Sequence, residues 1–333
     1  MRKINLILAI IGMALLNYSC NDEDKLTPSG QFIPTGLPFP QGDNPWDKDI
    51  VELHETYGVY VFYKDVTEAL LNRDWTSVGT GDIYTGGDLS DDKVQFYVDF
   101  IKNDVFKYVN KELVTKTLPV RLYLLDNFRT RPRIEVDDDT DTGTGGTDTD
   151  TGTGGTDTTD PRFIPFYADG FDYWALSFTD DEIQNLTHEA RRLRSVPFIY
   201  QMLKKAVMKG IITDTDAIRE GLDTKKRFKN SDPDSPDYYL NRGYPDNLYS
   251  NFKKSSVPWH PSEFYGTDAP DYPHEDFLNL IRNNMWYSEA EIESKYPLEK
   301  YPLLRKRLDI VYKHLLDNYG IDLKAIGAGS EAN

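Results

Sequence analysis

Three of the five histidines in this 333-residue chain are followed directly by a glutamate, a pairing typical of zinc-peptidase helices. That motif needs a second histidine four residues on, which puts both imidazoles on one helix face with the glutamate as the water's general base. The pairs are His54–Glu55, His188–Glu189 and His274–Glu275, and the fourth position holds Gly58, Arg192 and Leu278 in turn. No pair is complete, and an arginine repels a dication and cannot ligate it.

A zinc site could still assemble from scattered residues, for example His188, His274 and Glu275. The sequence otherwise predicts no catalytic residue and no metal ligand, with His188, Glu189, His274 and Glu275 as vestigial candidates and zinc as the alternative cofactor. Glycine-rich phosphate loops, nucleophile elbows and dinucleotide fingerprints are absent from the sequence. Whether the protein is an enzyme stays open, and the motifs favour an inactive one.

Strands come early in the chain and helices late. The apolar, β-rich segments Val59–Tyr63, Val120–Leu125 and Tyr173–Phe178 predict strands. A helix is expected from Asp91, with apolar residues at helical spacing as far as Tyr108.

Four further helices are expected. They cover residues 180–194, 197–209, 274–283 and 300–319. The last has an apolar stripe formed by Leu304, Leu308, Val311, Leu315 and Tyr319. Thr179 and Glu182 form a capping box, Pro197 suits a first helical turn, and Gly210 suits a helix end. The sum is an α+β fold.

Residues 137–160 contain only Asp, Thr and Gly, and Thr140–Asp148 repeats residue for residue at Thr149–Asp157. Two calcium motifs fit poorly: Thr142 stands where an EF-hand loop needs glycine, and a β-roll needs apolar residues that this segment lacks. The composition instead predicts a disordered acidic insert within one domain spanning residues 46–333.

The N-terminus has the features of a bacterial lipoprotein signal. Arg2 and Lys3 precede an apolar run from Leu6 to Leu16, which is too short to span a bilayer, and Cys20 follows Ser19. We therefore predict a signal peptide at residues 1–19 and lipidation of Cys20, although Asn17 and Tyr18 depart from the usual pattern. Residues 20–45, acidic and then rich in proline and glycine, predict a tether to the membrane.

Charge and cysteine content exclude other classes. The chain carries 55 acidic and 38 basic residues, a net charge of −17, which argues against nucleic-acid binding. One cysteine rules out an intrachain disulfide and a cysteine-rich zinc finger.

The order of segments resembles a family of outer-membrane lipoproteins described as zinc-binding metallopeptidases or substrate-import-associated zinc metallohydrolases. Trp46–Tyr63 is similar to that family's opening helix and strand, and Arg307–Leu323 to its closing helix. The segment HEDFLNL at 274–280 resembles one whose first glutamate, here Glu275, is the third zinc ligand.

The family's central HExxH is degenerate here in two registers. One places it at His188, Glu189 and Arg192, and the other at Gln201, Met202 and Lys205. The resemblance implies a zincin-like fold, with N-terminal strands and a helix before a mostly helical C-terminal half.

The resemblance also implies a location and a role. The expected protein is a surface-exposed, lipid-anchored lipoprotein of the bacterial outer membrane, catalytically inactive, beside a TonB-dependent importer and its binding lipoprotein. Its ligand would be a glycan or a peptide. The alternatives are an active zinc metallohydrolase with a rearranged site and a purely structural subunit of an import complex.

Substituting Cys20 tests the predicted anchor. Cys20→Ala removes the thiol that would be acylated, so we expect an unprocessed precursor that takes up no labelled fatty acid. Palmitate labelling and the electrophoretic mobility of the chain measure both effects. A mutant that still carries lipid label would contradict the prediction.

Overall fold

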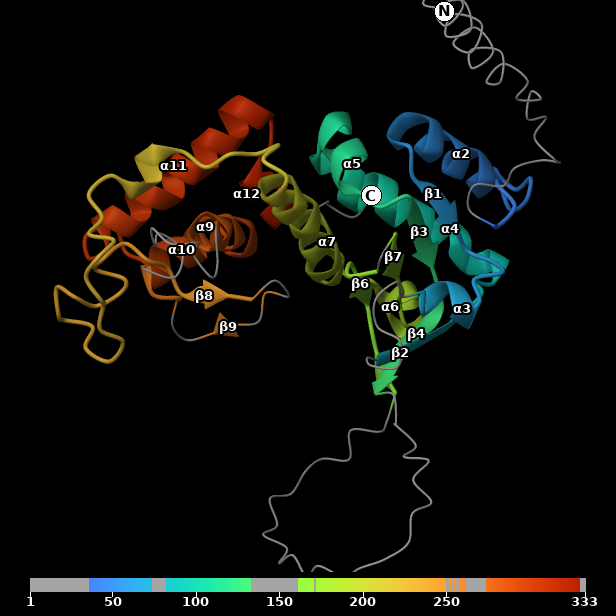
Figure 1. Cartoon of the computed structure of the whole chain (residues 1–333), viewed down its shortest axis with the longest axis horizontal. Coiled ribbons are helices and arrows are strands. Elements are labelled where there is room, and N and C mark those ends of the chain that lie inside the picture. Colours follow the sequence, from blue (N-terminus) through green and yellow to red (C-terminus); the bar gives the residue numbers. More distant parts are fainter. Residues whose placement is uncertain are drawn as a thin grey trace, which may run out of the picture. The chain divides into compact units, whose positions relative to one another are not determined.

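A four-stranded mixed sheet organises the N-terminal half (Figure 1). Its order is β1 (Tyr60–Phe62), β3 (Arg121–Leu124), β7 (Tyr173–Leu176) and β6 (Phe166–Tyr167). The first three strands are parallel, and β6 pairs antiparallel with β7 at the edge. Every residue of β3 and β7 is buried, as parallel central strands covered on both faces require.

The computed structural model describes residues 36–73, 82–132, 161–170, 172–249, 252, 254–255, 258–261 and 274–329, and residues 39–333 form one compact unit. The three predicted strands are confirmed as β1, β3 and β7. The predicted signal segment, Cys20 and the insert lie outside the described residues. In the part of the chain that is described, no helix has the length and apolarity needed to cross a membrane.

The N-terminal half contains the helices α2 (Pro45–Tyr57), α3 (Glu68–Leu71), α4 (Asp91–Phe100) and α5 (Lys111–Thr117). The helix expected from Asp91 to Tyr108 is correct in extent but changes type, passing into a π turn, η1 (Ile101–Val105), and a 3₁₀ turn, η2 (Phe106–Tyr108). The widened turn holds buried Asp104, whose carboxylate lies 2.8 Å from the Arg191 guanidinium. Arg191 belongs to the next long helix, so the turn fastens that helix to the sheet layer.

Residues 180–209 form two helices, but the predicted division at 195–196 is wrong. Thr179 and Glu182 form the predicted capping box of α6 (Asp180–Asn185). Thr187 then caps α7 (His188–Met208) by accepting a hydrogen bond from the Ala190 amide at 3.2 Å. Pro197 lies inside α7, where it removes one backbone hydrogen bond. The threonine cap, not the proline, therefore sets the boundary.

The C-terminal half is helical. It contains η3 (Asp216–Arg219), α9 (Glu275–Trp286), α10 (Glu289–Lys295), α11 (Pro302–Tyr319), α12 (Leu323–Ala328) and the two-stranded ribbon of β8 (Asn247–Leu248) and β9 (Lys254–Ser255). The predicted apolar stripe of α11 is buried at Leu304, Leu308, Val311 and Leu315. The α+β class, strands first and helices after, is confirmed.

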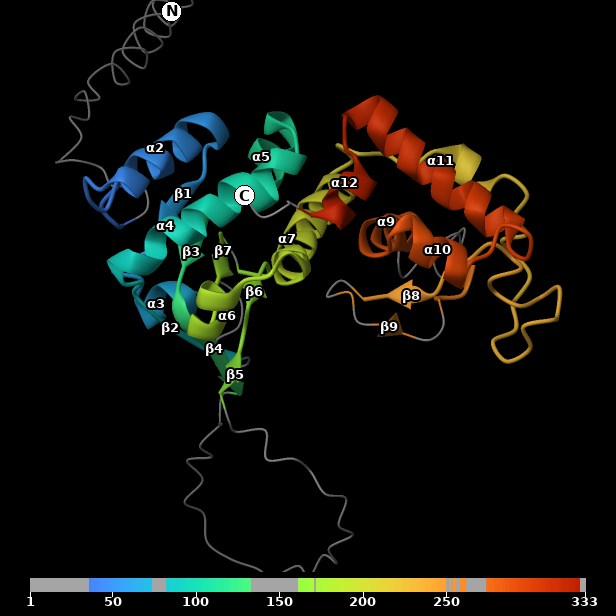
Figure 2. The same ribbon diagram turned by 180° about the vertical axis from the view of Figure 1, so that it is seen from behind.

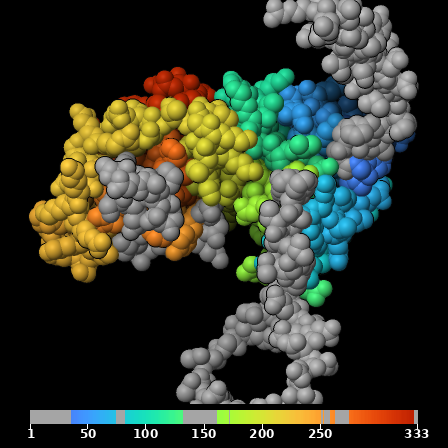
Figure 3. All heavy atoms as spheres, viewed as in Figure 1, coloured from blue at the N-terminus to red at the C-terminus, as the bar shows by residue number. Residues whose placement is uncertain are grey.

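Helix α7 joins the two halves. It lies between the sheet layer and the C-terminal helices in both ribbon views (Figures 1 and 2), and it contacts η1, α5, α9 and α12. Seen as spheres, its atoms are continuous with both halves (Figure 3). A direct contact outside α7 also links the halves, since the Asn110 amide donates to the Tyr319 carbonyl at 2.9 Å.

A second, three-stranded sheet has the order β2 (Asp82–Gly87), β4 (Asp126–Pro132) and β5 (Arg162–Phe163), all antiparallel. Arg129 pairs with Phe163 and Thr130 with Arg162, so β4 and β5 are the two arms of one hairpin. The Asp/Thr/Gly insert falls between these arms in sequence. A loop of only a few residues can connect the two strands of a hairpin.

Removing the insert tests whether it contributes to the fold. Deleting residues 137–160 and joining the ends with a short Gly-Ser turn should change the free energy of unfolding by less than about 1 kcal/mol, because the segment has no apolar side chain to bury. Thermal melting of both proteins, with and without calcium, provides the measurement. A large loss of stability, or a calcium-dependent shift of the intact protein, would show a structured site.

Candidate functional site

Glu275 opens helix α9, and its carboxylate is bound by an arginine of the same helix. The Arg282 guanidinium donates to Glu275 and to the Tyr200 hydroxyl of α7, and at 3.3 Å to the Asn247 amide oxygen. Two helical turns separate residues 275 and 282, which places both on one face. The Arg282 side chain is only 3% exposed, so its charge needs the carboxylate as a partner.

The same face of α9 buries further polar groups. Asn279 accepts from the Leu248 amide at 3.1 Å, and Asn283 donates to the Asp246 carbonyl at 3.1 Å. Asp276 pairs with Arg307 of α11, and both side chains are at least 96% buried. Helix α9 is thus held to α7, α11 and the β8 segment by fully buried hydrogen bonds.

Tyr200 is part of this network through its hydroxyl. Burial raises the pKa of Tyr200 to about 12, and the neighbouring Arg282 charge opposes part of that rise. The phenol therefore stays neutral at physiological pH and accepts the hydrogen bond from Arg282. Arg282 thus links the Tyr200 hydroxyl to the Glu275 carboxylate, which is bound to a permanent cation.

The second His-Glu pair, His188–Glu189, forms the first turn of α7. Both guanidinium nitrogens of Arg192 that face Glu189 donate to its carboxylate at 2.8 Å, and this bond lowers the pKa of Glu189. Arg192 also lies 4.9 Å from the centre of the Trp286 ring. Arg192, which stands where the motif needs its second histidine, is therefore the ion-pair partner of Glu189.

Glu275 and His188 lie near opposite ends of α9. Arg192, one turn from His188, packs on Trp286 at the last residue of α9, whereas Glu275 is the first. Eleven residues of α-helix span roughly 16 Å, so the structure does not bring His188 to Glu275. The alternative zinc site from His188, His274 and Glu275 is therefore not assembled. His274 is an exposed N-cap with a φ of 70°.

The later register of the degenerate motif lies closer to Glu275. Gln201 follows Tyr200, the residue that Arg282 contacts, and Gln201 lines a cavity against the sheet edge. Lys205, one turn on, places its ammonium 4.8 Å from the Trp174 ring centre of β7. Burial, and next the charge of Lys209, lower the pKa of Lys205. Lys205 forms no ion pair with Glu189 or Glu275, which pair with Arg192 and Arg282.

That cavity, of about 640 Å³, lies between the edge of the two sheets and α7. Leu193, Pro197 and Gln201 form the α7 side, at successive helical turns. Aromatic side chains including Phe163, Phe166 and Tyr167 form the sheet side. Its mixed apolar and polar walls fit an organic ligand rather than a metal ion.

No three side chains of His, Cys, Asp or Glu converge to hold a metal among the residues that the structure describes. The first pair, His54–Glu55, lies on α2, where the His54 ring packs against Phe39 and Tyr60 at 5.0 and 4.0 Å between ring centres. The sequence analysis did not predict the contact between Arg282 and Glu275. The spacing of seven residues on a predicted helix was the signal that could have indicated it.

No protein-family model matches this chain, and no curated protein matches it. Among solved structures, it is similar to a protein of Bacteroides caccae described as a "putative zinc-binding metallo-peptidase". The two share 13% identity with a TM-score of 0.41, over 86% of this chain and 91% of that one. Likeness at this level carries no conclusion about activity.

Matched substitutions compare how much Glu275 and Glu189 contribute to stability. Glu275→Gln leaves buried Arg282 without its countercharge, so we expect a loss of about 3 kcal/mol in the free energy of unfolding. Glu189→Gln removes an ion pair whose carboxylate side chain is 59% exposed, and should cost less than about 1 kcal/mol. Urea denaturation measures both. Equal effects would mean that Glu275 is not the partner of a buried charge.

Proposed function

We propose that this protein is a catalytically inactive, metallopeptidase-like lipoprotein on the bacterial outer membrane. It acts as an accessory of a TonB-dependent system that imports a glycan or a peptide. The anchor is the lipidated Cys20, and the compact unit from Phe39 onward presents the binding surface.

One observation carries the loss of activity: the Glu275 carboxylate is bound by Arg282. A zinc ligand must offer a free lone pair to the metal, and a guanidinium within hydrogen-bonding distance competes for that lone pair and repels the ion. In the nearer register, Gln201 and Lys205 stand where imidazoles are needed. An amide is a weak zinc ligand, and an ammonium has no lone pair.

The cavity between α7 and the sheet edge supports a retained binding role. The cavity of about 640 Å³ has the size of a small-molecule site, with Gln201 and aromatic rings on its walls. Aromatic rings and amides suit both sugar rings and peptide groups. A purely structural subunit would leave this cavity without a ligand.

Metal content tests the proposal directly. Protein purified without chelators should contain far less than one zinc per chain and should cleave no peptide, because neither register supplies two imidazoles. Elemental analysis and a fluorogenic peptide library provide the measurements. Near-stoichiometric zinc, lost together with peptidase activity in Glu275→Ala, would instead establish the active metallohydrolase.

Ligand binding separates the remaining alternatives. Oligosaccharide and peptide libraries applied to zinc-free protein would show a ligand for an accessory with a binding role. Binding of neither would favour the structural subunit.

A further inference from the structure

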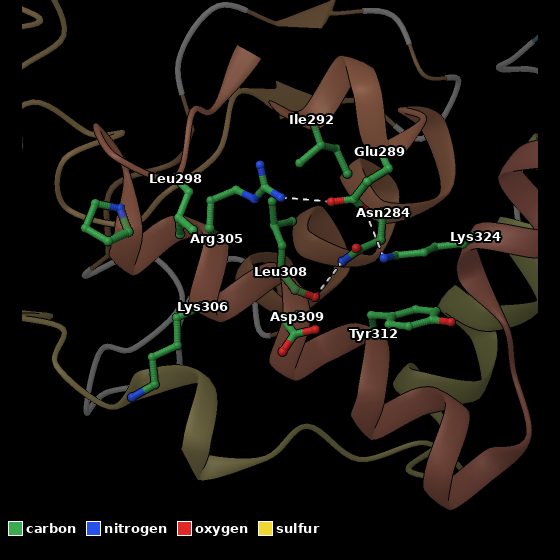
Figure 4. A pocket seen from close by; sticks show the side chains of 11 residues that line it. Asn284, Glu289, Ile292, Leu298, Arg305, Lys306, Leu308, Asp309, Tyr312 and Lys324 are labelled. Atoms are coloured by element: carbon green, nitrogen blue, oxygen red, sulfur yellow. Dashed lines mark hydrogen bonds and ion pairs between the residues drawn. The ribbon is translucent and has the colours of Figure 1, made fainter. Parts of the chain in front are cut away.

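A second cavity, of about 300 Å³, lies among the C-terminal helices (Figure 4). Its walls come from α9, α10, α11, α12 and the turn at Leu298. Asn284, nine residues along α9 from Glu275, lies roughly 13 Å from that residue by helical rise. The cavity shares no lining residue with the one beside α7. It is therefore a separate candidate site.

Asn284 gives this cavity a fixed hydrogen-bond acceptor. The residue is only 3% exposed, and its amide nitrogen donates to the carbonyls of Leu280 at 3.0 Å and Leu308 at 3.1 Å. Both donated bonds lock the orientation of the amide, and its oxygen has no hydrogen-bond donor among the described residues. In Figure 4 the amide lies beside Glu289 and Lys324. The oxygen can therefore accept a hydrogen bond from a molecule or water in the cavity.

The charged groups of the cavity balance one another. Glu289 lies 2.8 Å from both Arg305 and Lys324, and Arg305 also lies 2.5 Å from Glu293. Lys306 pairs with Glu220 and Asp309 with Lys313, each at 2.7 Å. Five of these charged side chains line the cavity, and their partners Glu293, Glu220 and Lys313 lie outside the lining. Together they make four acidic and four basic side chains, which sum to zero in a chain whose net charge is −17.

This balance selects against ionic ligands. An anion would have to displace Glu289 from its two cations, and a cation would have to displace Arg305 or Lys324 from Glu289. Each exchange loses an existing ion pair and gains one of similar strength. A neutral ligand with hydroxyl groups disturbs none of the pairs, and each hydroxyl can both donate to an amide oxygen and accept from an N–H.

An apolar side completes the cavity. Ile292 and Leu308 are buried in its wall, and Leu298 is 56% exposed at its rim. A sugar ring has the matching chemistry, because its hydroxyl groups lie around the ring edge and its C–H groups form an apolar face. The Nε–H of Arg305 has no acceptor within the described part of the chain, so it can donate to a hydroxyl.

We propose that this cavity binds one neutral sugar unit, with the Asn284 oxygen accepting a hydroxyl and Leu298 covering the C–H face. The site is independent of the cavity beside α7 and of whether the protein holds zinc. A positive result would identify a glycan-binding surface on the C-terminal helices.

Saturation-transfer NMR with methyl glycosides of glucose, galactose, mannose and N-acetylglucosamine tests the proposal on the intact mature protein. We expect binding of at least one glycoside. Leu298→Ser removes the apolar side chain that would cover the C–H face without altering the ion pairs, and should weaken that binding at least tenfold. Met208→Ser is the control, since Met208 on α7 is equally exposed at 56% and lies outside the cavity.

Three outcomes would overturn the proposal. The first is that none of the four glycosides binds. The second is that Leu298→Ser binds as well as Met208→Ser does, which would place the sugar elsewhere, for example beside α7. The third is that leucine, phosphate or spermidine competes for the cavity more strongly than the glycosides, which would mean that its charges recognise an ion.

Discussion

The buried guanidinium of Arg282 constrains the whole region around α9. A side chain 3% exposed cannot hold a charge without compensation, so Glu275, Tyr200 and Asn247 must stay in place around it. Since these partners come from α9, α7 and β8, their positions fix three elements relative to one another. Arg307, fully buried against Asp276, does the same for α11 and also donates to the Ile218 carbonyl at 2.7 Å.

These arginines explain how the loop-rich segment between α7 and α9 is held. Residues 210–249 contain only the short elements η3 and β8, so backbone ladders cannot organise them. Side chains from α9 and α11 bind their carbonyls instead, as Asn283 does for Asp246. Local propensity in such a segment is weak, and tertiary hydrogen bonds decide its path.

The sequence predicted those elements that are determined by interactions between residues close together in the chain. Apolar runs and caps act locally, and they correctly predicted β1, β3, β7, the start of α6 and the buried stripe of α11. The two-residue strands β5 and β6 carry too short a pattern to be read, and their pairing is decided by distant partners. Pro197 misled the prediction because α7 is held by tertiary contacts that offset one lost hydrogen bond.

The candidate site follows the same rule. That no His-Glu pair was complete could be read from spacing alone, but two registers of the motif stayed open on one helix. Tertiary packing places the two stretches at different ends of α9: Arg192 near His188 contacts its end, whereas Tyr200 meets its beginning through Arg282. Only a long-range contact carries that information.

Under the proposed function, Arg282 links helices α9 and α7, a link that a bound metal ion would otherwise make. A zinc ion bound by Glu275 and by two residues of α7 would crosslink the two helices, and Arg282 makes the same link from Glu275 to Tyr200. The exchange leaves no unpaired buried carboxylate, so the fold survives it. It also makes the change hard to reverse. Imidazoles introduced at Gln201 and Lys205 alone would still face a carboxylate already bound to a permanent cation, so Arg282 would have to be replaced as well before a metal could compete for Glu275.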